Sequence, residues 1–233
     1  MPNELRIGLI DSGVNAGHPH VGAVAGGASF GLDAQGKVSI GSAYADEIGH
    51  GTALAGIIAC REPRASIYAL KIFNRQLSTN TKVLLAAIQW ALDQQCRLVH
   101  LSLGTRLKKH LAELKSLCGK ASAMGVAMVA SCPSRHEKVY PAALKEVIGV
   151  YWNRACAWDD LEYHPKQAIE FGAHGHPRQL PGLPREMNFK GSSFAAAHIT
   201  GMAANVMAER PGLKPNQLSD YIYRRLNKST FNI

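Results

Sequence analysis

Three residues whose side chains can act together in nucleophilic catalysis stand where expected strands meet expected helices. Asp11 directly follows the apolar segment Leu5–Ile10. His50 lies between two glycines at the start of a helix of small residues, and Ser193 opens a later helix. A serine hydroxyl becomes a strong nucleophile only when an adjacent base takes its proton. A carboxylate that binds the second imidazole nitrogen fixes the tautomer of that base.

Each residue also has an ordinary structural explanation. Asp11 suits a turn or a helix cap, Ser193 suits a helix N-cap, and a lone histidine at a helix start is usually an exposed polar side chain. The three residues together are more informative than any one of them alone. In an open parallel sheet, the carboxyl ends of the strands line the functional crevice, so three such groups in order indicate one catalytic site.

The elements that must position these residues alternate along the chain. Apolar runs predict strands at Leu5–Ile10, Ser66–Phe73, Arg97–Leu103, Val126–Ser131 and Glu146–Trp152. Helical spacing predicts helices at His50–Cys60, Val83–Gln94, Leu111–Met124, Ser192–Glu209 and Pro215–Asn227. Residues 14–48, rich in Gly and Ala, predict loops with short strands. Continuously apolar strands between helices are typical of a parallel sheet covered on both faces, so we expect a single α/β domain over residues 1–233.

Composition and charge limit the class of protein and the compartment in which we expect it. The 233 residues are 46% hydrophobic, an ordinary globular composition, and carry a net charge of +9. No apolar run approaches the roughly 20 residues of a membrane span, and no secretory signal opens the chain. The five cysteines are scattered without a Cys-x-x-Cys pair. We therefore expect reduced, mostly buried thiols in a cytoplasmic protein that does not associate with membranes.

The positive charge predicts an acidic partner. No nucleic-acid recognition motif accompanies it, so we expect no nucleic acid, and the charge alone leaves the class of partner open. The pair His174 and His176 has no further metal-ligand spacing around it and is interpreted as a loop fragment. We expect neither a metal ion nor a cofactor.

The motifs around these residues resemble those of the subtilisin-like serine peptidases, over nearly the whole chain. Three ordered segments carry the resemblance: Ile10–Val14 followed by His18-Pro19, then His50–Ala59, then Gly191–Gly201. Secondary matches are Tyr68–Ile72, Leu101–Gly104, Tyr140–Ala143 and Val147–Val150. The resemblance implies a three-layer α/β/α sandwich with a mostly parallel sheet, and peptide-bond hydrolysis.

The resemblance also implies a role for each residue. Ser193 would be the nucleophile, His50 the general base and Asp11 the group that orients His50. Ser102, Leu103 and Gly104 would form a wall of the substrate cleft, where the substrate adds as an extended strand.

One position departs from the family pattern. Subtilisins usually place an asparagine side chain in the oxyanion hole, and the matching position here is Ser134. Removal of that donor from subtilisin itself costs about 10²–10³ in kcat. Three interpretations stay open: Ser134 donates a weaker bond, Arg135 or His136 donates instead, or the enzyme is slow and serves one specific substrate.

The motif of Asp11 begins so early that we expect no propeptide within this sequence. Small size, the missing propeptide and the unusual oxyanion position together favour a processing protease of narrow specificity, which removes a leader from a dedicated peptide or protein. An acidic leader would complement the net charge. Two alternatives remain: a general intracellular degradative subtilisin, and a pseudo-enzyme that binds a peptide strand without cutting it.

Overall fold

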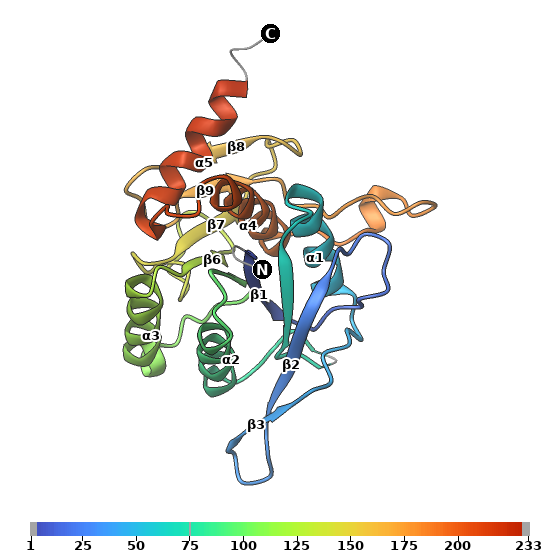
Figure 1. The fold of residues 1–233 in the computed structure, drawn as a ribbon, viewed down its shortest axis with the longest axis vertical. Coiled ribbons are helices and arrows are strands. Elements are labelled where there is room, and N and C mark those ends of the chain that lie inside the picture. The colour runs from blue at the N-terminus through green and yellow to red at the C-terminus, as the bar shows by residue number, and fades with distance from the viewer. Residues whose placement is uncertain (1–3, 75, 230–233) are drawn as a thin grey trace.

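A computed structural model describes residues 4–74 and 76–229, and its strands form one sheet (Figure 1). The sheet has nine strands in the order β3-β2-β4-β1-β5-β6-β7-β9-β8. Only β3 and β8, at its two edges, run antiparallel to their neighbours. The strands are β1 (Arg6–Asp11), β2 (Val24–Leu32), β3 (Val38–Gly41), β4 (Ser66–Lys71), β5 (Leu98–Leu101), β6 (Ala127–Ser131), β7 (Ile148–Trp152), β8 (Leu161–Tyr163) and β9 (Phe171–Ala173).

Helices cover both faces of the sheet, which gives three layers (Figure 1). Helices α2 and α3 pack on one face, and α1, α4 and α5 lie on the other. The helices are α1 (His50–Arg61), α2 (Thr81–Asp93), α3 (Leu111–Ala123), α4 (Ser192–Glu209) and α5 (Pro215–Ser229), with 3₁₀ turns η1 (Lys108–His110) and η2 (Arg185–Met187). The described residues therefore have the subtilisin-like α/β/α architecture that the sequence predicts.

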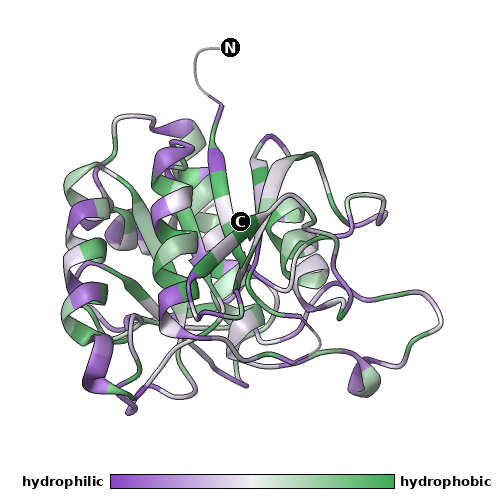
Figure 2. Ribbon diagram, turned by 90° about the horizontal axis from the view of Figure 1, so that it is seen from below, coloured by the Kyte–Doolittle hydropathy of each residue, from purple (hydrophilic) through white to green (hydrophobic). Residues whose placement is uncertain are grey.

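Strand β1 shows why its sequence is apolar on both sides. Ile7 and Leu9 belong to the core on the α1 and α4 side, whereas Ile10 belongs to the core on the α2 and α3 side. Successive side chains point to opposite faces, so a strand in the middle layer must be apolar throughout. Hydrophobic residues accordingly dominate the central strands in Figure 2. Gly8 lets α2 approach, because a Cβ at this position would lie 3.1 Å from that of Ala91.

The predicted strands and helices are all present, with ends shifted by up to two residues. The main difference is β2, which runs for nine residues inside the segment expected to hold loops with short strands. Its glycines hide the pattern, yet they are required. A Cβ at Gly27 would lie 2.2 Å from the carbonyl oxygen of Ala69 on β4. The three-residue strands β8 and β9 were not predicted, because so short a run carries no period.

Helix α4 is surrounded by the fold rather than lying on its surface. Its 18 residues are mostly small, and most of them are buried. The close approach of α1 explains the small residues: a Cβ at Gly201 would lie 2.8 Å from the Cβ of Arg61. Despite this burial, no helix in the described part of the chain is long and apolar enough to cross a membrane.

Candidate active site

Asp11 and His50 are in direct contact at the carboxyl end of β1. The Nδ1 atom of His50 lies 2.7 Å from Oδ1 of Asp11, and the Asp11 carboxylate is completely buried. Burial opposes ionisation of Asp11, but hydrogen bonds from His50 and Ser102 outweigh it and hold the pKa of this carboxyl below its ordinary value. The imidazole is therefore oriented by an ionised carboxylate, and its Nε2 atom is left for other chemistry.

A second carboxylate holds the start of α1, which carries His50. The N-cap residue, Gly49, has left-handed backbone (φ 88°) and no side chain to cap the helix. Asp46 caps the helix from outside it. Its Oδ1 accepts from the backbone N–H of Gly49 and its Oδ2 accepts from that of Thr52, both at 2.9 Å. The hydroxyl of Ser12 links the two carboxylates, because it lies 2.9 Å from Asp46 and 3.1 Å from Asp11.

Ser102, which follows β5, connects Asp11 with Ser193. Its hydroxyl donates a hydrogen bond to Oδ2 of Asp11, and its carbonyl oxygen accepts one from the Ser193 hydroxyl at 3.3 Å. The structure thus brings the three predicted catalytic residues to one edge of the sheet. In this arrangement the Ser193 hydroxyl is bonded to Ser102 and not to His50. Catalytic hydrogen bonds are often long or misaligned before a substrate binds and tighten in its complex.

Ser193 stands in the first turn of α4. The backbone N–H of Ser193 forms no hydrogen bond with the described residues, as expected for the first turn of a helix. The helix dipole favours negative charge at this end. Phe194 packs its ring 5.1 Å from that of His50, and Phe189 approaches the same imidazole at 5.8 Å. The site therefore pairs a base with an anion-favouring helix end, beside apolar rings.

Ser134, the predicted oxyanion donor, lies half-buried in the turn after β6. Its hydroxyl is 3.4 Å from a carboxylate oxygen of Glu137. Arg135 and His136 are exposed, and the Arg135 guanidinium contacts His164 next to β8 at 3.1 Å. Among the described residues, none of these side chains forms a hydrogen bond with Ser193, and the oxyanion role of Ser134 remains a prediction.

The predicted substrate wall is an open segment beside Ser193. Leu103 is half-buried and Gly104 is exposed, and neither forms a backbone hydrogen bond with the described residues. The following residue, Thr105, exchanges backbone hydrogen bonds with Tyr140 at 2.8 and 2.9 Å. A side chain at position 104 would collide with Val139, because its Cβ would lie 2.2 Å from that side chain. The free backbone groups suit the addition of a strand.

One histidine outside this site, His198, is held by structural contacts. His198 is buried on α4, where its Nδ1 accepts a hydrogen bond from Arg61 and its Nε2 donates to the carbonyl of His176, each at 3.0 Å. Burial first, and then the charge of Arg61, lower the pKa of His198 to about 3. Within residues 4–74 and 76–229 no group of three or more His, Cys, Asp or Glu side chains is arranged to hold a metal ion.

Two residues of the site, Asp46 and Phe189, were not predicted from the sequence. Asp46 stands four residues before His50, and an acidic residue just before a helix start can signal such a cap. The sequence gives no such signal for Phe189. Its ring contacts His50 only because of the way in which the segment between β9 and α4 folds.

Comparisons with known proteins found a family and several relatives. The profile of the peptidase S8 subtilase family matches residues 3–232. A thermostable alkaline protease of Halalkalibacterium halodurans is 28% identical over 241 residues, which cover 94% of this chain and 61% of the relative. Subtilisin DY of Bacillus licheniformis is 28% identical over 254 residues, covering 98% of this chain and 84% of that protein.

The fold has a solved counterpart as well. The structure of sphericase superposes with a TM-score of 0.71 at 23% sequence identity, covering 96% of this chain and 85% of that one. This likeness supports the architecture. The family match over nearly the whole sequence establishes the class, and the chain belongs to the subtilase family of peptidases.

Proposed function

We propose that this protein is a serine endopeptidase in which Asp11, His50 and Ser193 form the catalytic triad. The carrying observation is the 2.7 Å contact between His50 and the buried Asp11, beside a serine in the first turn of α4. His50 takes the proton of the Ser193 hydroxyl, the alkoxide attacks the scissile carbonyl, and the leaving amine receives the proton. Asp11 stabilises the imidazolium. The unpaired N–H of Ser193 donates to the oxyanion, and Ser134 is a candidate second donor.

Fluorophosphonate labelling tests the triad. We expect the folded protein to be labelled at Ser193 at neutral pH, and Ser193→Ala to abolish the labelling. Ser192→Ala is the matched control, because the neighbouring hydroxyl is engaged elsewhere and accepts a bond from the N–H of Trp152 at 3.2 Å. Absence of label on wild-type protein with an intact circular dichroism spectrum would contradict the proposal and favour the strand-binding pseudo-enzyme.

We further infer a narrow-specificity processing role: removal of a leader from a dedicated peptide or protein substrate. Two observations support it. The position usually held by an oxyanion-hole asparagine is Ser134, whose hydroxyl faces Glu137, and this favours low turnover. The net charge of +9 favours an acidic polypeptide partner. The compact layout resembles subtilisin-like enzymes that process modified polypeptides, such as the leader-cleaving protease of quinohemoprotein amine dehydrogenase maturation.

Product analysis separates this role from general degradation. We expect mass spectrometry to show little cleavage of unfolded casein over hours, with a single cut in a candidate leader-bearing precursor. Ser193→Ala should retain that precursor in a pull-down, whereas wild-type protein releases it cut. Rapid digestion of casein at many sites would instead identify a degradative subtilisin.

We also propose that the protein acts in the cytoplasm and that residues 1–233 form one peptidase domain. All five cysteines are free thiols, and only Cys60 among them is exposed. Buried unpaired thiols are typical of reducing compartments. Fractionation of the native host with an antibody against the protein tests the location, and recovery from the medium would contradict it.

A further inference from the structure

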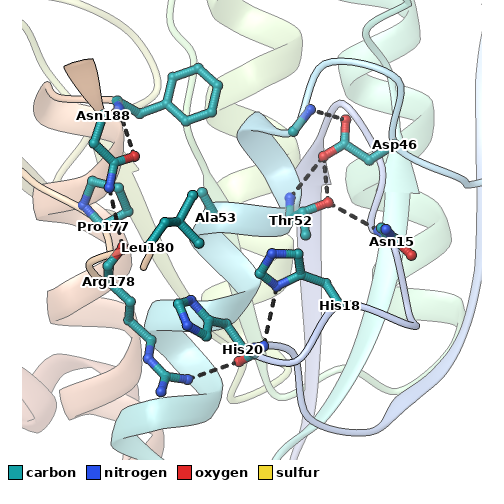
Figure 3. Close-up of a pocket in the computed structure, with 12 residues that line it drawn as sticks. Asn15, His18, His20, Asp46, Thr52, Ala53, Pro177, Arg178, Leu180 and Asn188 are labelled. Atoms are coloured by element: carbon teal, nitrogen blue, oxygen red, sulfur yellow. Dashed lines mark hydrogen bonds between the residues drawn. The ribbon is translucent and has the colours of Figure 1, made fainter. Parts of the chain in front are cut away.

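A pocket opens beside the first turns of α1, the helix that carries His50 (Figure 3). Its volume is about 210 Å³, enough for one side chain. Gly49 and Phe189 line it, and both adjoin the imidazole of His50: Gly49 precedes it in sequence and the Phe189 ring contacts it. The leaving amine must approach His50 to receive its proton, so a substrate side chain next to that amine can reach this pocket.

Three groups that can carry positive charge gather in this pocket. They are His18 and His20, from the loop after β1, and Arg178, from the segment between β9 and α4 (Figure 3). The two imidazole rings lie 5.1 Å apart, and the Arg178 guanidinium donates to the carbonyl oxygen of His20 at 3.3 Å. Among the described residues no carboxylate lies within ion-pairing distance of any of the three.

The donors of this cluster remain available. The Nδ1 atom of His18 accepts a hydrogen bond from the N–H of His20 at 3.1 Å, which leaves Nε2 as its donor. Arg178 uses one of its N–H groups on a protein acceptor and retains the others. Burial first, and then the charges of Arg178 and His18, lower the pKa of His20. The protein has thus placed three groups that can carry positive charge together without an internal counter-ion.

Asp46 also lines the pocket but does not serve as that counter-ion. Its two oxygens accept hydrogen bonds from the backbone N–H groups of Ile48, Gly49 and Thr52 and from the Thr52 hydroxyl, all within 3.0 Å. Ser12 adds a further donor at 2.9 Å. A carboxylate with five donors has its lone pairs occupied, so Asp46 does not pair with the Arg178 guanidinium across the pocket.

Ala53, Pro177, Leu180 and Phe189 give the pocket an apolar wall, and Asn15, Thr52 and Asn188 add polar groups to its lining. An apolar wall suits the methylene groups of a side chain whose end is charged. We propose that this pocket receives a carboxylate-bearing side chain of the polypeptide substrate, on the leaving-group side of the scissile bond, with Arg178, His18 and His20 around the carboxylate. The inference rests on the proposed peptidase function and specifies its substrate, a polypeptide with an acidic residue on the leaving-group side of the scissile bond.

The first test measures selectivity within each variant, so that loss of folding cannot imitate the result. Wild-type protein is given a positional set of short peptides in which Glu, Gln or Lys occupies each position in turn. We expect kcat/KM to favour Glu over Gln by about tenfold at one position after the scissile bond, the effect of a hydrogen bond to a charged group. Arg178→Gln should bring this ratio close to one, and Arg178→Glu should shift the preference to Lys.

Arg185→Gln is the matched control. Arg185 lies on the same segment between β9 and α4 but outside this pocket, and its guanidinium is directed towards His174 at 3.4 Å. Its replacement removes the same charge and should preserve the Glu preference. An unchanged Glu-to-Gln ratio in Arg178→Gln, or an equal loss in Arg185→Gln, would overturn the proposal.

A second readout does not require cleavage. In Ser193→Ala protein, the imidazole resonances of His18 and His20 are followed by NMR during titration with glutarate, and with glutaramide as the uncharged match. We expect glutarate alone to shift both resonances and to raise the pKa of His20, because an anion stabilises the imidazolium. If wild-type Ser193 is labelled by fluorophosphonate but glutarate causes no shift, the pocket proposal fails alone. A glutarate shift without labelling would instead contradict the peptidase function and leave the pocket as a carboxylate site.

Discussion

Thr52 is joined to Asp46 by two hydrogen bonds, from its backbone N–H at 2.9 Å and from its hydroxyl at 2.6 Å. This pair fastens the first turn of α1 to the turn that precedes it. His50 lies in that first turn, and its contact with Asp11 therefore depends on a carboxylate that does not itself touch the imidazole. Positioning of the base extends beyond the three residues that react.

We expect Asp46→Ala to lower both stability and labelling. The change leaves several backbone and hydroxyl donors without their acceptor, so the free energy of unfolding should fall by about 1–3 kcal/mol. The fluorophosphonate labelling rate should fall further than the folded fraction does, since the start of α1 loosens. Urea unfolding and labelling kinetics measure the two effects. Asp33→Ala is the control, because Asp33 is exposed and caps only the turn between β2 and β3; an equal loss in both variants would contradict this role.

Two glycine-to-alanine changes in helices should have opposite outcomes. A Cβ at Gly51 would lie 2.2 Å from the carbonyl oxygen of Gly13 and 3.1 Å from Oδ1 of Asp11. Gly51→Ala should therefore push α1 away from β1 and cut the labelling rate by more than tenfold. Gly119 on α3 has nothing within 4 Å of such an atom. Gly119→Ala should raise stability by about 0.5–1 kcal/mol in thermal unfolding, through helix propensity alone. Normal labelling of Gly51→Ala would refute the steric argument.

Asp11→Asn should preserve the fold but disable the base. An amide at this position can donate to the imidazole and so favour the wrong tautomer, and the corresponding change in a Ser-His-Asp protease lowers kcat by about 10⁴. The labelling rate at neutral pH should fall by a similar factor while the circular dichroism spectrum is retained. Asp33→Asn again provides the control. A loss smaller than tenfold would show that Asp11 does not orient His50 in the manner proposed.

Acid should destabilise the protein through its buried neutral histidines. Burial lowers the pKa of His198 to about 3 and that of His100 to about 4. Unfolded histidine titrates near 6.5. Below that pH the unfolded chain therefore binds protons that these buried histidines do not bind in the folded protein. Stability due to each group is intact above pH 6.5 and declines as pH falls towards its folded pKa, by about 1.4 kcal/mol per pH unit.

Urea unfolding at pH 5 and pH 6 measures this slope. His198→Gln should reduce it by about one proton equivalent, roughly 1.4 kcal/mol per unit, whereas His136→Gln, at an exposed position, should leave it unchanged. Equal slopes in wild-type protein and His198→Gln would mean that His198 is not the group that resists protonation.

The order of elements was predictable from sequence because parallel strands in this fold are buried on both faces. Leu5–Ile10 is recognisable from its own residues, since nearly every side chain must be apolar. Helix α4 was predicted with its observed bounds, Ser192–Glu209. The length of β2 was underestimated because its glycines are required by close contacts with neighbours on β4 and elsewhere. Such contacts leave no periodic pattern in the sequence. The residue pattern of one segment indicates which of its own residues are buried. Close approach between two segments is seen only in the assembled sheet.

The same limit applies to the candidate site. Asp11, His50 and Ser193 could be selected because their motifs stand at strand-to-helix junctions. The double role of Ser102, which donates to Asp11 and accepts from Ser193, could not, because it needs the distance between β1 and β5. The pocket beside His50 combines residues 15–20 with residues 177–189, which no local pattern connects. The sequence motifs therefore indicated the catalytic chemistry. The pocket, which is built from loops distant in sequence, could not be predicted from them.

The enclosure of α4 has a consequence for amide hydrogen exchange. Nearly every side chain from Phe194 to Met207 is buried, and the Thr200 hydroxyl fastens the helix to His100 on β5 at 2.9 Å. The central turns of such a helix present little surface to solvent. The amides of its central turns should therefore exchange only through global unfolding. Their exchange rates would then report the free energy of the whole domain, read from the segment that carries Ser193.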